Sequence, residues 1–450
     1  MRDLAFIGFL LALFGMGFRK PFLFVLAYAY IDIVSPQRLT YLLLNSMPIS
    51  LIAVALAVLG WAAMDDKKDV RIAPRQGLIL LLLAYCFYTT LNADFKVEAL
   101  DKWDWVWKAL AFAAFLPLTL RTKLRIESLL LFMILSAASI IIVGGIKTLG
   151  SGGGYGELNL MVANNSGLYE GSTISTVAIA IIPLIVWFTR FGTIFPPDWK
   201  VKAFCYALIF ACLLIPVGTS TRTGLLCIGL LALLMIRDTK RKVVYLAALG
   251  CLGLAAVPFL PSSFTERMGT IKTYQADASA STRLAVWQWT MDYVKTHPMG
   301  GGFEAYRQNR IRYEKVAVEG EGAGQTKVDR SLEVDQARAY HSAYFEMLGE
   351  QGYPGLAIWL LINLIGIVRM EVLRQRYRRP EPGQEWIAPL ASALQNAHIV
   401  YMLGATFIAI AFQPFVYMLI GAQIGLDTYC ARKRAERDWR PLRRAKPALA

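Results

Sequence analysis

Repeated apolar runs constrain this sequence more than any other feature. They are about 15 to 22 residues long, which is the length of helices that cross a lipid bilayer. The 450 residues are 56% hydrophobic and only 18% charged, so the chain has too little polar surface for a soluble domain of this length. The sequence therefore predicts an all-α, polytopic integral membrane protein with about 12 or 13 transmembrane helices.

The apolar runs also predict where the spans lie and how they are oriented. If the spans alternate, clusters of lysine and arginine fall on one side of the membrane, and the positive-inside rule assigns that side to the cytoplasm. Alternation fails only in the first 35 residues, where two spans, one broken span or a re-entrant pair all fit. The predicted spans are 4–18, 21–35, 44–64, 76–92, 104–120, 125–147, 172–190, 201–216, 223–237, 242–260, 352–373, 390–411 and 414–430.

This pattern divides the chain into four parts. Residues 1–260 form an N-terminal transmembrane bundle, 261–351 a large excursion with short amphipathic helices, 352–431 the C-terminal spans, and 432–450 a basic cytoplasmic tail. The excursion is close to charge-balanced, so it faces away from the cytoplasm. The net charge of +15 lies mainly in short loops and in the tail, a distribution typical of topology signals and contacts with anionic membrane lipids rather than nucleic acid.

The short turn 217–224 contains a single charge, Arg222, at the outer edge of the membrane. Thr221 and three other hydroxyl residues surround it, and hydroxyls beside a guanidinium suit an anionic ligand. The alternative is an arginine that reaches outward to a lipid phosphate.

Within the excursion, the residue spacing predicts a helix at 282–295 with Trp287 on its buried face and Arg283 in its first turn. His297, followed by Pro298 and the Gly300–Gly302 run, predicts the end of that helix, so His297 is assigned a structural role. Residues 309–336 are rich in Gly, Glu and Lys and are interpreted as a mobile outer loop.

A second amphipathic helix is predicted at 338–348, with His341 and Tyr344 on one face. Arg338 lies about one turn before His341, and a nearby cation favours the neutral imidazole, which is the form able to accept a proton. His398, inside an apolar span, is expected to hydrogen-bond to neighbouring helices. Carboxylates do not occur at metal-ligand spacing near these residues, so neither a metal nor another cofactor is predicted.

Three motifs together resemble the O-antigen ligase and polymerase superfamily of bacterial envelopes. They are the Thr-Ser-Thr-Arg222-Thr-Gly turn, the helix from Arg283 to Trp287 with its His297-Pro298 and glycine end, and the run from His341 to Gly352. The N-terminal region resembles the branch described as exosortase-associated O-glycosylation ligases. Each motif is degenerate by itself, and their order along the chain carries the resemblance.

The resemblance implies a multi-pass GT-C type enzyme of the bacterial inner membrane whose active site faces the periplasm. Such an enzyme transfers a glycan from undecaprenyl pyrophosphate to an acceptor, which in the ligases is the lipid A core of lipopolysaccharide. By motif position, Arg222 and Arg283 match the pyrophosphate-binding arginines and His341 matches the catalytic histidine. Ser342 departs from the asparagine of many members. Supporting roles are expected for Arg338, Tyr344, Trp287 and Thr221.

Other functions share parts of this pattern. An O-antigen polymerase or a protein O-glycosylation ligase uses the same donor with a different acceptor. A transporter for a lipid-linked sugar belongs to another class, but such transporters tend to show internal repeats and charged residues near the membrane centre. The polar residues of this sequence cluster instead at one membrane face.

Overall fold

The structure is a computed structural model in which most of the chain is described. The residues that it does not describe are 1, 41–43, 45–46, 69, 71, 151–166, 238, 240, 245–246, 248–249, 252–277, 322–324 and 439–450. Side chains at 312–333, inside two strands, are likewise not described.

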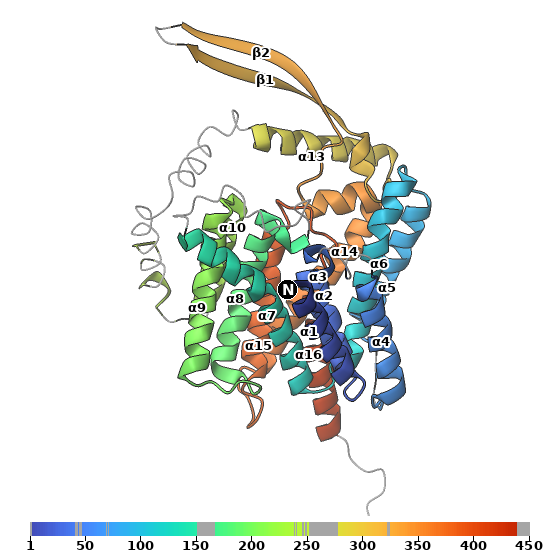
Figure 1. Ribbon diagram of the computed structural model, residues 1–450, viewed down its shortest axis with the longest axis vertical. Helices are drawn as coiled ribbons and strands as arrows, with labels where there is room; N and C mark the ends of the chain where they lie inside the picture. The colour runs from blue at the N-terminus through green and yellow to red at the C-terminus, as the bar shows by residue number, and fades with distance from the viewer. Residues whose placement is uncertain are drawn as a thin grey trace, which may run out of the picture.

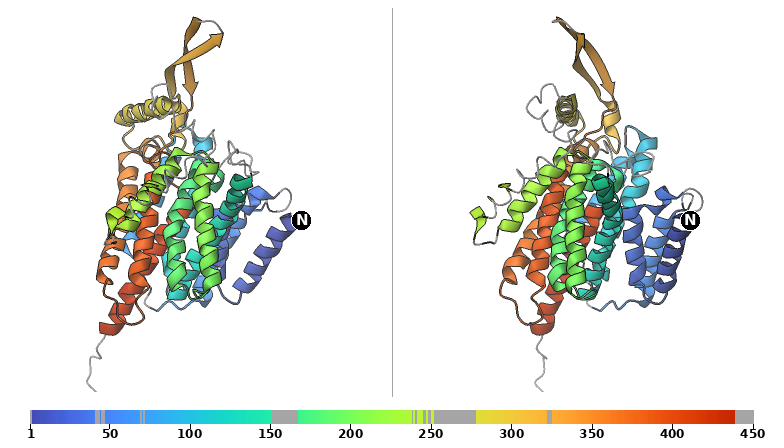
Figure 2. Two further views of the ribbon diagram at one scale, coloured as in Figure 1. Left: turned by 90° about the vertical axis from the view of Figure 1, so that its left-hand side faces the viewer. Right: turned by 60° about the vertical axis from the view of Figure 1, so that its left-hand side comes forward.

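Long helices lie side by side in a single bundle (Figures 1 and 2). Every predicted span contains a helix except 242–260, which lies largely outside the described residues. The helices of the bundle are α1 (Arg2–Gly17), α2 (Phe22–Val34), α3 (Pro36–Leu39), α4 (Ile49–Met64), α5 (Pro74–Leu91), α6 (Lys96–Thr119), α7 (Lys123–Gly150), α8 (Gly171–Phe191), α9 (Trp199–Gly218), α10 (Arg222–Ile236), α14 (Ala343–Arg376), α15 (Ile387–Gly404) and α16 (Pro414–Asp438), with the 3-10 turn η1 (Gly167–Tyr169) before α8.

Four helices of the described chain are both long and apolar enough to cross a membrane: α7, α8, α9 and α14. Helices α1, α2, α4 and α10 are apolar but shorter. These helices support a multi-pass membrane protein, while the total of 12 or 13 spans stays a prediction.

The excursion lies across one end of the bundle. It contains α13 (Ala278–Thr296), the 3-10 turn η4 (Ala305–Gln308), and the strands β1 (Arg310–Glu321) and β2 (Gln325–Gln336). Figure 1 shows α13 above the bundle and the two strands projecting beyond it.

The two strands correct the sequence interpretation of 309–336 as a mobile loop, while the fold as a whole is compatible with the predicted all-α class. They pair antiparallel as a hairpin, with Arg310 opposite Gln336 and Glu321 opposite Gln325. Valine at 316 and 318 follows the alternation that favours strands, whereas the overall Gly, Glu and Lys content suggested a loop. The alternation of apolar and polar residues therefore predicted this segment better than its composition did.

Helix α15 ends earlier than the predicted span 390–411. It stops at Gly404, where a Cβ atom would collide with Thr176 of α8, and the chain then runs irregularly to Pro414. The backbone of this irregular segment bonds to the start of α14: the Ala343 amide donates to the Ala405 carbonyl at 2.8 Å. Tertiary contacts therefore replace the helical hydrogen bonds that the apolar sequence suggested.

Two of the basic loops lie together with the C-terminal end of α16 at one end of the bundle. Arg125 pairs with Asp65 at 2.6 Å, and Arg432 donates to the Arg121 carbonyl at 3.0 Å. The excursion contacts other loops, since the Asp94 amide donates to the Gly301 carbonyl, and Figure 2 shows the excursion and α16's C-terminal end at opposite ends. The side of the cell that each end faces stays a prediction.

A buried polar network crosses the helices in the interior. His398 of α15 hydrogen-bonds to Asn363 of α14 at 2.8 Å and to Gln423 of α16 at 3.1 Å. Arg75 of α5 donates to the Gln423 side chain at 2.8 Å. The predicted role of His398 in bonding neighbouring helices is therefore confirmed.

Candidate functional site

His341 lies in the short connection between the hairpin and α14. Its φ angle is +49°, a left-handed conformation that is unusual for a residue with a side chain and persists only where surrounding contacts hold it. The next residue, Ser342, is the N-cap position of α14. The backbone thus turns sharply at His341, whose side chain remains exposed.

Trp287 holds the chain immediately before His341. Its indole Nε1 donates to the Tyr340 carbonyl at 2.9 Å, and its ring stacks on Phe345 with centroids 4.9 Å apart and planes 6° apart. Because Trp287 lies on α13 and Phe345 on α14, one side chain joins the two helices on either side of His341. Trp287 therefore holds the backbone next to His341 in place.

Three charged side chains act on His341, of which Arg283 and Glu170 come from distant parts of the sequence. Partial desolvation lowers the pKa of the imidazole, the positive charges of Arg283 and Arg338 lower that pKa further, and the Glu170 carboxylate opposes them. The expectation that neighbouring cations favour the neutral imidazole is confirmed in direction. At neutral pH this ring is therefore in the form that accepts a proton.

Arg338 is held in place by both its backbone and its side chain. Asn309 donates to the Arg338 carbonyl at 2.7 Å and accepts from the Arg338 amide at 2.9 Å. The guanidinium Nε lies 2.6 Å from Asp335 Oδ2. These contacts form a frame at the base of the hairpin beside His341.

The turn that carries Arg222 is folded back onto α9. Its amides at 219, 220 and 221 donate to carbonyls of the last turn of α9, and Ser220 adopts a φ of +50°. Arg222 is the first residue of α10. The positive end of the α10 dipole therefore adds to the guanidinium charge at this position, a combination that favours an anion.

Two hydroxyls of this turn make contacts that the sequence did not predict. Thr219 and Thr221 bond to Ser175 of α8 at 2.8 and 3.0 Å and lie 3.2 Å from each other. Thr221 consequently fastens the turn to α8 and makes no side-chain cap on α10. In these contacts the Thr221 hydroxyl holds the turn in place.

The first turn of α8 connects the Arg222 turn with His341. A Cβ atom at Gly171 would lie 3.3 Å from Thr219, so the two segments pack directly together. The preceding residue, Glu170, caps α8 by accepting from the amides of Ser172 and Thr173, and its charge acts on His341. The arginine turn and the histidine thus lie at the same end of the bundle.

Tyr344 contacts the neighbouring helix α15, whereas His297 packs on α13, the helix that it follows. The Tyr344 hydroxyl donates to the Met402 carbonyl at 3.2 Å, and its ring meets Trp359 edge-on at 5.3 Å. His297 follows the last residue of α13 and stacks on Tyr293 at 4.2 Å. The predicted end of this helix is confirmed, and Tyr344 anchors α14 to the end of α15.

Sequence reasoning missed several charged residues near this site. Sequence analysis assigned no role to Glu170, Lys102, Glu346 or Glu350. The spacing of Glu346 and Glu350, four residues apart in an amphipathic helix, was a signal that both occupy one face. Among the described residues, no group of three His, Cys, Asp or Glu side chains is close enough to hold a metal ion.

The apolar helices support a multi-pass membrane protein, and the Arg222 turn and His341 lie at one end of its bundle. Residues 206–360 match the family model described as O-antigen ligase, and this range includes Arg222, Arg283 and His341. The chain therefore carries a domain of the O-antigen ligase family, and this match supports a ligase- or polymerase-type glycan-transfer function in the membrane. Residues 1–193 match a family of unknown function. No curated protein matches the chain.

Proposed function

We propose that this protein transfers a glycan from undecaprenyl pyrophosphate to the lipid A core of lipopolysaccharide. The reaction takes place at the periplasmic face of the bacterial inner membrane, inverts the anomeric carbon and needs no metal ion, as in a GT-C type enzyme. The observation that supports it most is the position of His341, beside Arg283 and Arg338 and inside the O-antigen ligase domain.

The donor follows from the chemistry available outside the cytoplasm. Nucleotide sugars and ATP are absent there, so the transferred glycan must arrive already activated. A lipid pyrophosphate fits, because its apolar tail partitions into the bilayer while its charged head reaches the outer boundary. Arg222, at the start of α10, and Arg283 would bind the pyrophosphate and stabilise the negative charge that develops as it leaves.

His341 would act as the general base. The imidazole accepts the proton of an acceptor sugar hydroxyl, and the hydroxyl oxygen forms a bond to the anomeric carbon. The bond from that carbon to the pyrophosphate oxygen breaks on the opposite face, and undecaprenyl pyrophosphate departs with the electron pair. Positioned general-base catalysis contributes about 10²- to 10⁴-fold in rate.

The decisive experiment uses purified protein with an undecaprenyl-pyrophosphate-linked glycan and lipid A core as acceptor, with and without a chelator. We expect transfer in both conditions, and a loss of about 10²- to 10⁴-fold for His341→Ala. The matched control is His297→Ala, which removes a histidine from the helix end and keeps transfer. Wild-type turnover by His341→Ala would contradict the assignment of the base, and loss of turnover in chelator would contradict metal independence.

The arginines are tested through donor binding. Arg222→Ala should weaken binding of the lipid pyrophosphate together with turnover, because the guanidinium contacts the pyrophosphate before and during its departure. Intact donor affinity in this variant would argue instead for a role in packing.

The acceptor separates the ligase from its alternatives. A second lipid-linked glycan in place of lipid A core tests the polymerase reaction, and a protein substrate tests O-glycosylation. Elongated glycan with no transfer to lipid A core would replace the ligase proposal by the polymerase.

A further inference from the structure

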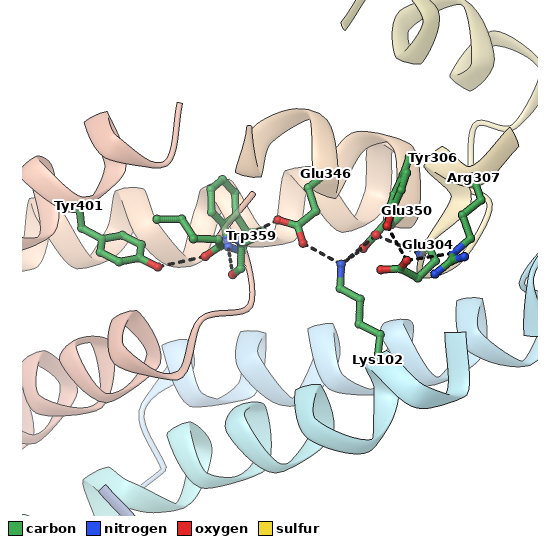
Figure 3. Close-up of polar contacts among 10 residues, drawn as sticks. Lys102, Glu304, Tyr306, Arg307, Glu346, Glu350, Trp359 and Tyr401 are labelled. Atoms are coloured by element: carbon green, nitrogen blue, oxygen red, sulfur yellow. Dashed lines mark hydrogen bonds and ion pairs between the residues drawn. The ribbon is translucent and has the colours of Figure 1, made fainter. Parts of the chain in front are cut away.

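A buried ion-pair cluster joins the N-terminal part of the chain to the helix that follows His341. The Lys102 ammonium, from α6, lies 2.7 Å from Glu346 Oε1 and 2.8 Å from Glu350 Oε1. Both glutamates are buried, with 4% and 0% of their surface exposed. Figure 3 shows the ammonium pointing between the two carboxylates of α14.

The carboxylates also bind backbone amides from other segments. Glu346 Oε2 accepts from the Ala411 amide at 3.0 Å, and Glu350 Oε1 accepts from the Glu304 amide at 3.0 Å. One cluster thus connects α6, α14, the start of η4 and the irregular segment between α15 and α16. Two aromatic rings flank the Lys102 ammonium at 5.4 and 5.7 Å, those of Phe303 and Phe412.

The Gly300–Gly302 turn closes around the same part of α14. The amides of Gly301 and Gly302 donate to the carbonyls of Gly349 and Glu350 at 3.1 and 2.9 Å. Gly352 then breaks the helix with a φ of +62°. Residues 343–351 therefore form a short helical segment with its own fixed contacts, and His341 lies two residues before it.

A single ammonium pairs with both buried carboxylates in this cluster. Breaking a buried ion pair leaves charge without compensation in a medium of low dielectric, so the neighbouring segments must shift or admit water to relieve it. The placement of 343–351 against α6 consequently depends on Lys102. Lys102 lies within 1–193, the part matched only by a family of unknown function, whereas both glutamates lie within 206–360.

We propose that Lys102 is a positioning residue for glycan transfer: it holds the 343–351 segment, and through it His341, in the geometry that the reaction needs. The N-terminal part of the chain thereby completes the catalytic unit of the O-antigen ligase domain. This inference rests on the function proposed above.

The test compares Lys102→Met with Lys96→Met in the full-length protein. Lys96 is an exposed residue of the same helix, so the control makes the same chemical change without touching the cluster. For Lys102→Met we expect kcat to fall about 10- to 100-fold, the range caused by displacing a catalytic group by about 1 Å. The KM for the lipid-linked donor should stay at its wild-type value, because the Arg222 turn lies outside the cluster. The proposal would be overturned if Lys102→Met had the same kcat as Lys96→Met. It would also be overturned if the donor KM of Lys102→Met rose by the same factor as its kcat fell.

A second variant decides the matter if Lys102→Met does not fold. The triple variant Lys102→Met, Glu346→Gln and Glu350→Gln removes the three charges of the cluster. Its glutamine side chains can still accept hydrogen bonds from the backbone amides. We expect this variant to fold and to retain the low kcat, since the ionic contact between α6 and 343–351 is missing. Wild-type kcat in the triple variant would overturn the proposal.

Hydrogen–deuterium exchange separates this inference from the proposed function. Amide exchange in 343–351 should be faster in Lys102→Met than in Lys96→Met, a readout that needs no substrate. Unchanged exchange overturns the positioning role of Lys102. Absence of glycan transfer by the wild-type protein overturns the proposed function instead.

Discussion

Replacing Trp287 by phenylalanine isolates one hydrogen bond that holds the chain before His341. The substitution removes the indole N–H that donates to the Tyr340 carbonyl at 2.9 Å and keeps an aromatic ring to stack on Phe345. Such a bond contributes about 0.5–1.5 kcal/mol. If that free energy is lost in the transition state, kcat falls about 2- to 13-fold, since each 1.36 kcal/mol is tenfold in rate.

Trp287→Ala extends the series, because it removes the ring as well. The stacking contact adds about 0.5–1.5 kcal/mol, so the combined loss of about 1–3 kcal/mol predicts a fall in kcat of about 5- to 150-fold. We therefore expect turnover to decrease from the wild type to Trp287→Phe and further to Trp287→Ala.

The assay is the initial rate of glycan transfer at saturating donor and acceptor, with folded protein quantified by size-exclusion chromatography. Trp289→Phe is the matched control, since Trp289 also lies on α13 but stacks on Tyr293, and the hydrogen bond to the Tyr340 carbonyl comes from Trp287. If Trp287→Phe and Trp289→Phe both turn over at the wild-type rate, the indole hydrogen bond does not position the base.

Three further predictions concern charges and contacts around the site. A histidine base acts when it is neutral, so activity is lost as pH falls through the His341 pKa. Arg338→Gln removes a cation that lowers this pKa, so the acidic limb of the kcat–pH profile should move to higher pH. Glu170→Gln removes the carboxylate that raises the same pKa and should move the limb to lower pH; limbs that shift in the same direction would refute the electrostatic reasoning. Thr221→Val removes the hydroxyl bonded to Ser175 at 3.0 Å and should lower the free energy of unfolding by about 0.5–1.5 kcal/mol. Thermal unfolding in detergent checks this prediction, and an unchanged midpoint would contradict the role of the contact.

Local patterns predicted most of the helices and several of their ends, but the helix predicted to begin at 338 begins only at Ala343, after His341. Apolar runs located the helices because bilayer length and hydrophobicity are properties of consecutive residues. The stop at His297 was predictable because proline and glycine limit the backbone wherever they occur. The β1–β2 hairpin was missed because composition was weighed above alternation, although the alternation was present in the sequence.

Family resemblance selected Arg222, Arg283 and His341 as site residues, and the pattern around Arg338 indicated a neutral histidine. The sequence did not predict that Thr221 bonds to Ser175 of α8. That contact joins residues far apart in sequence, and nothing in the turn itself reveals it.

The sequence by itself determined a helical membrane protein with a polar excursion and a histidine preceded by an arginine. Only the tertiary structure decided that Glu170 faces the same histidine, that Lys102 pairs with Glu346 and Glu350, and that α15 gives way to an irregular segment at Gly404. Hydropathy and helix signals act over a few neighbouring residues, whereas a buried charge is satisfied by whichever partner the packing of distant helices brings within hydrogen-bonding distance.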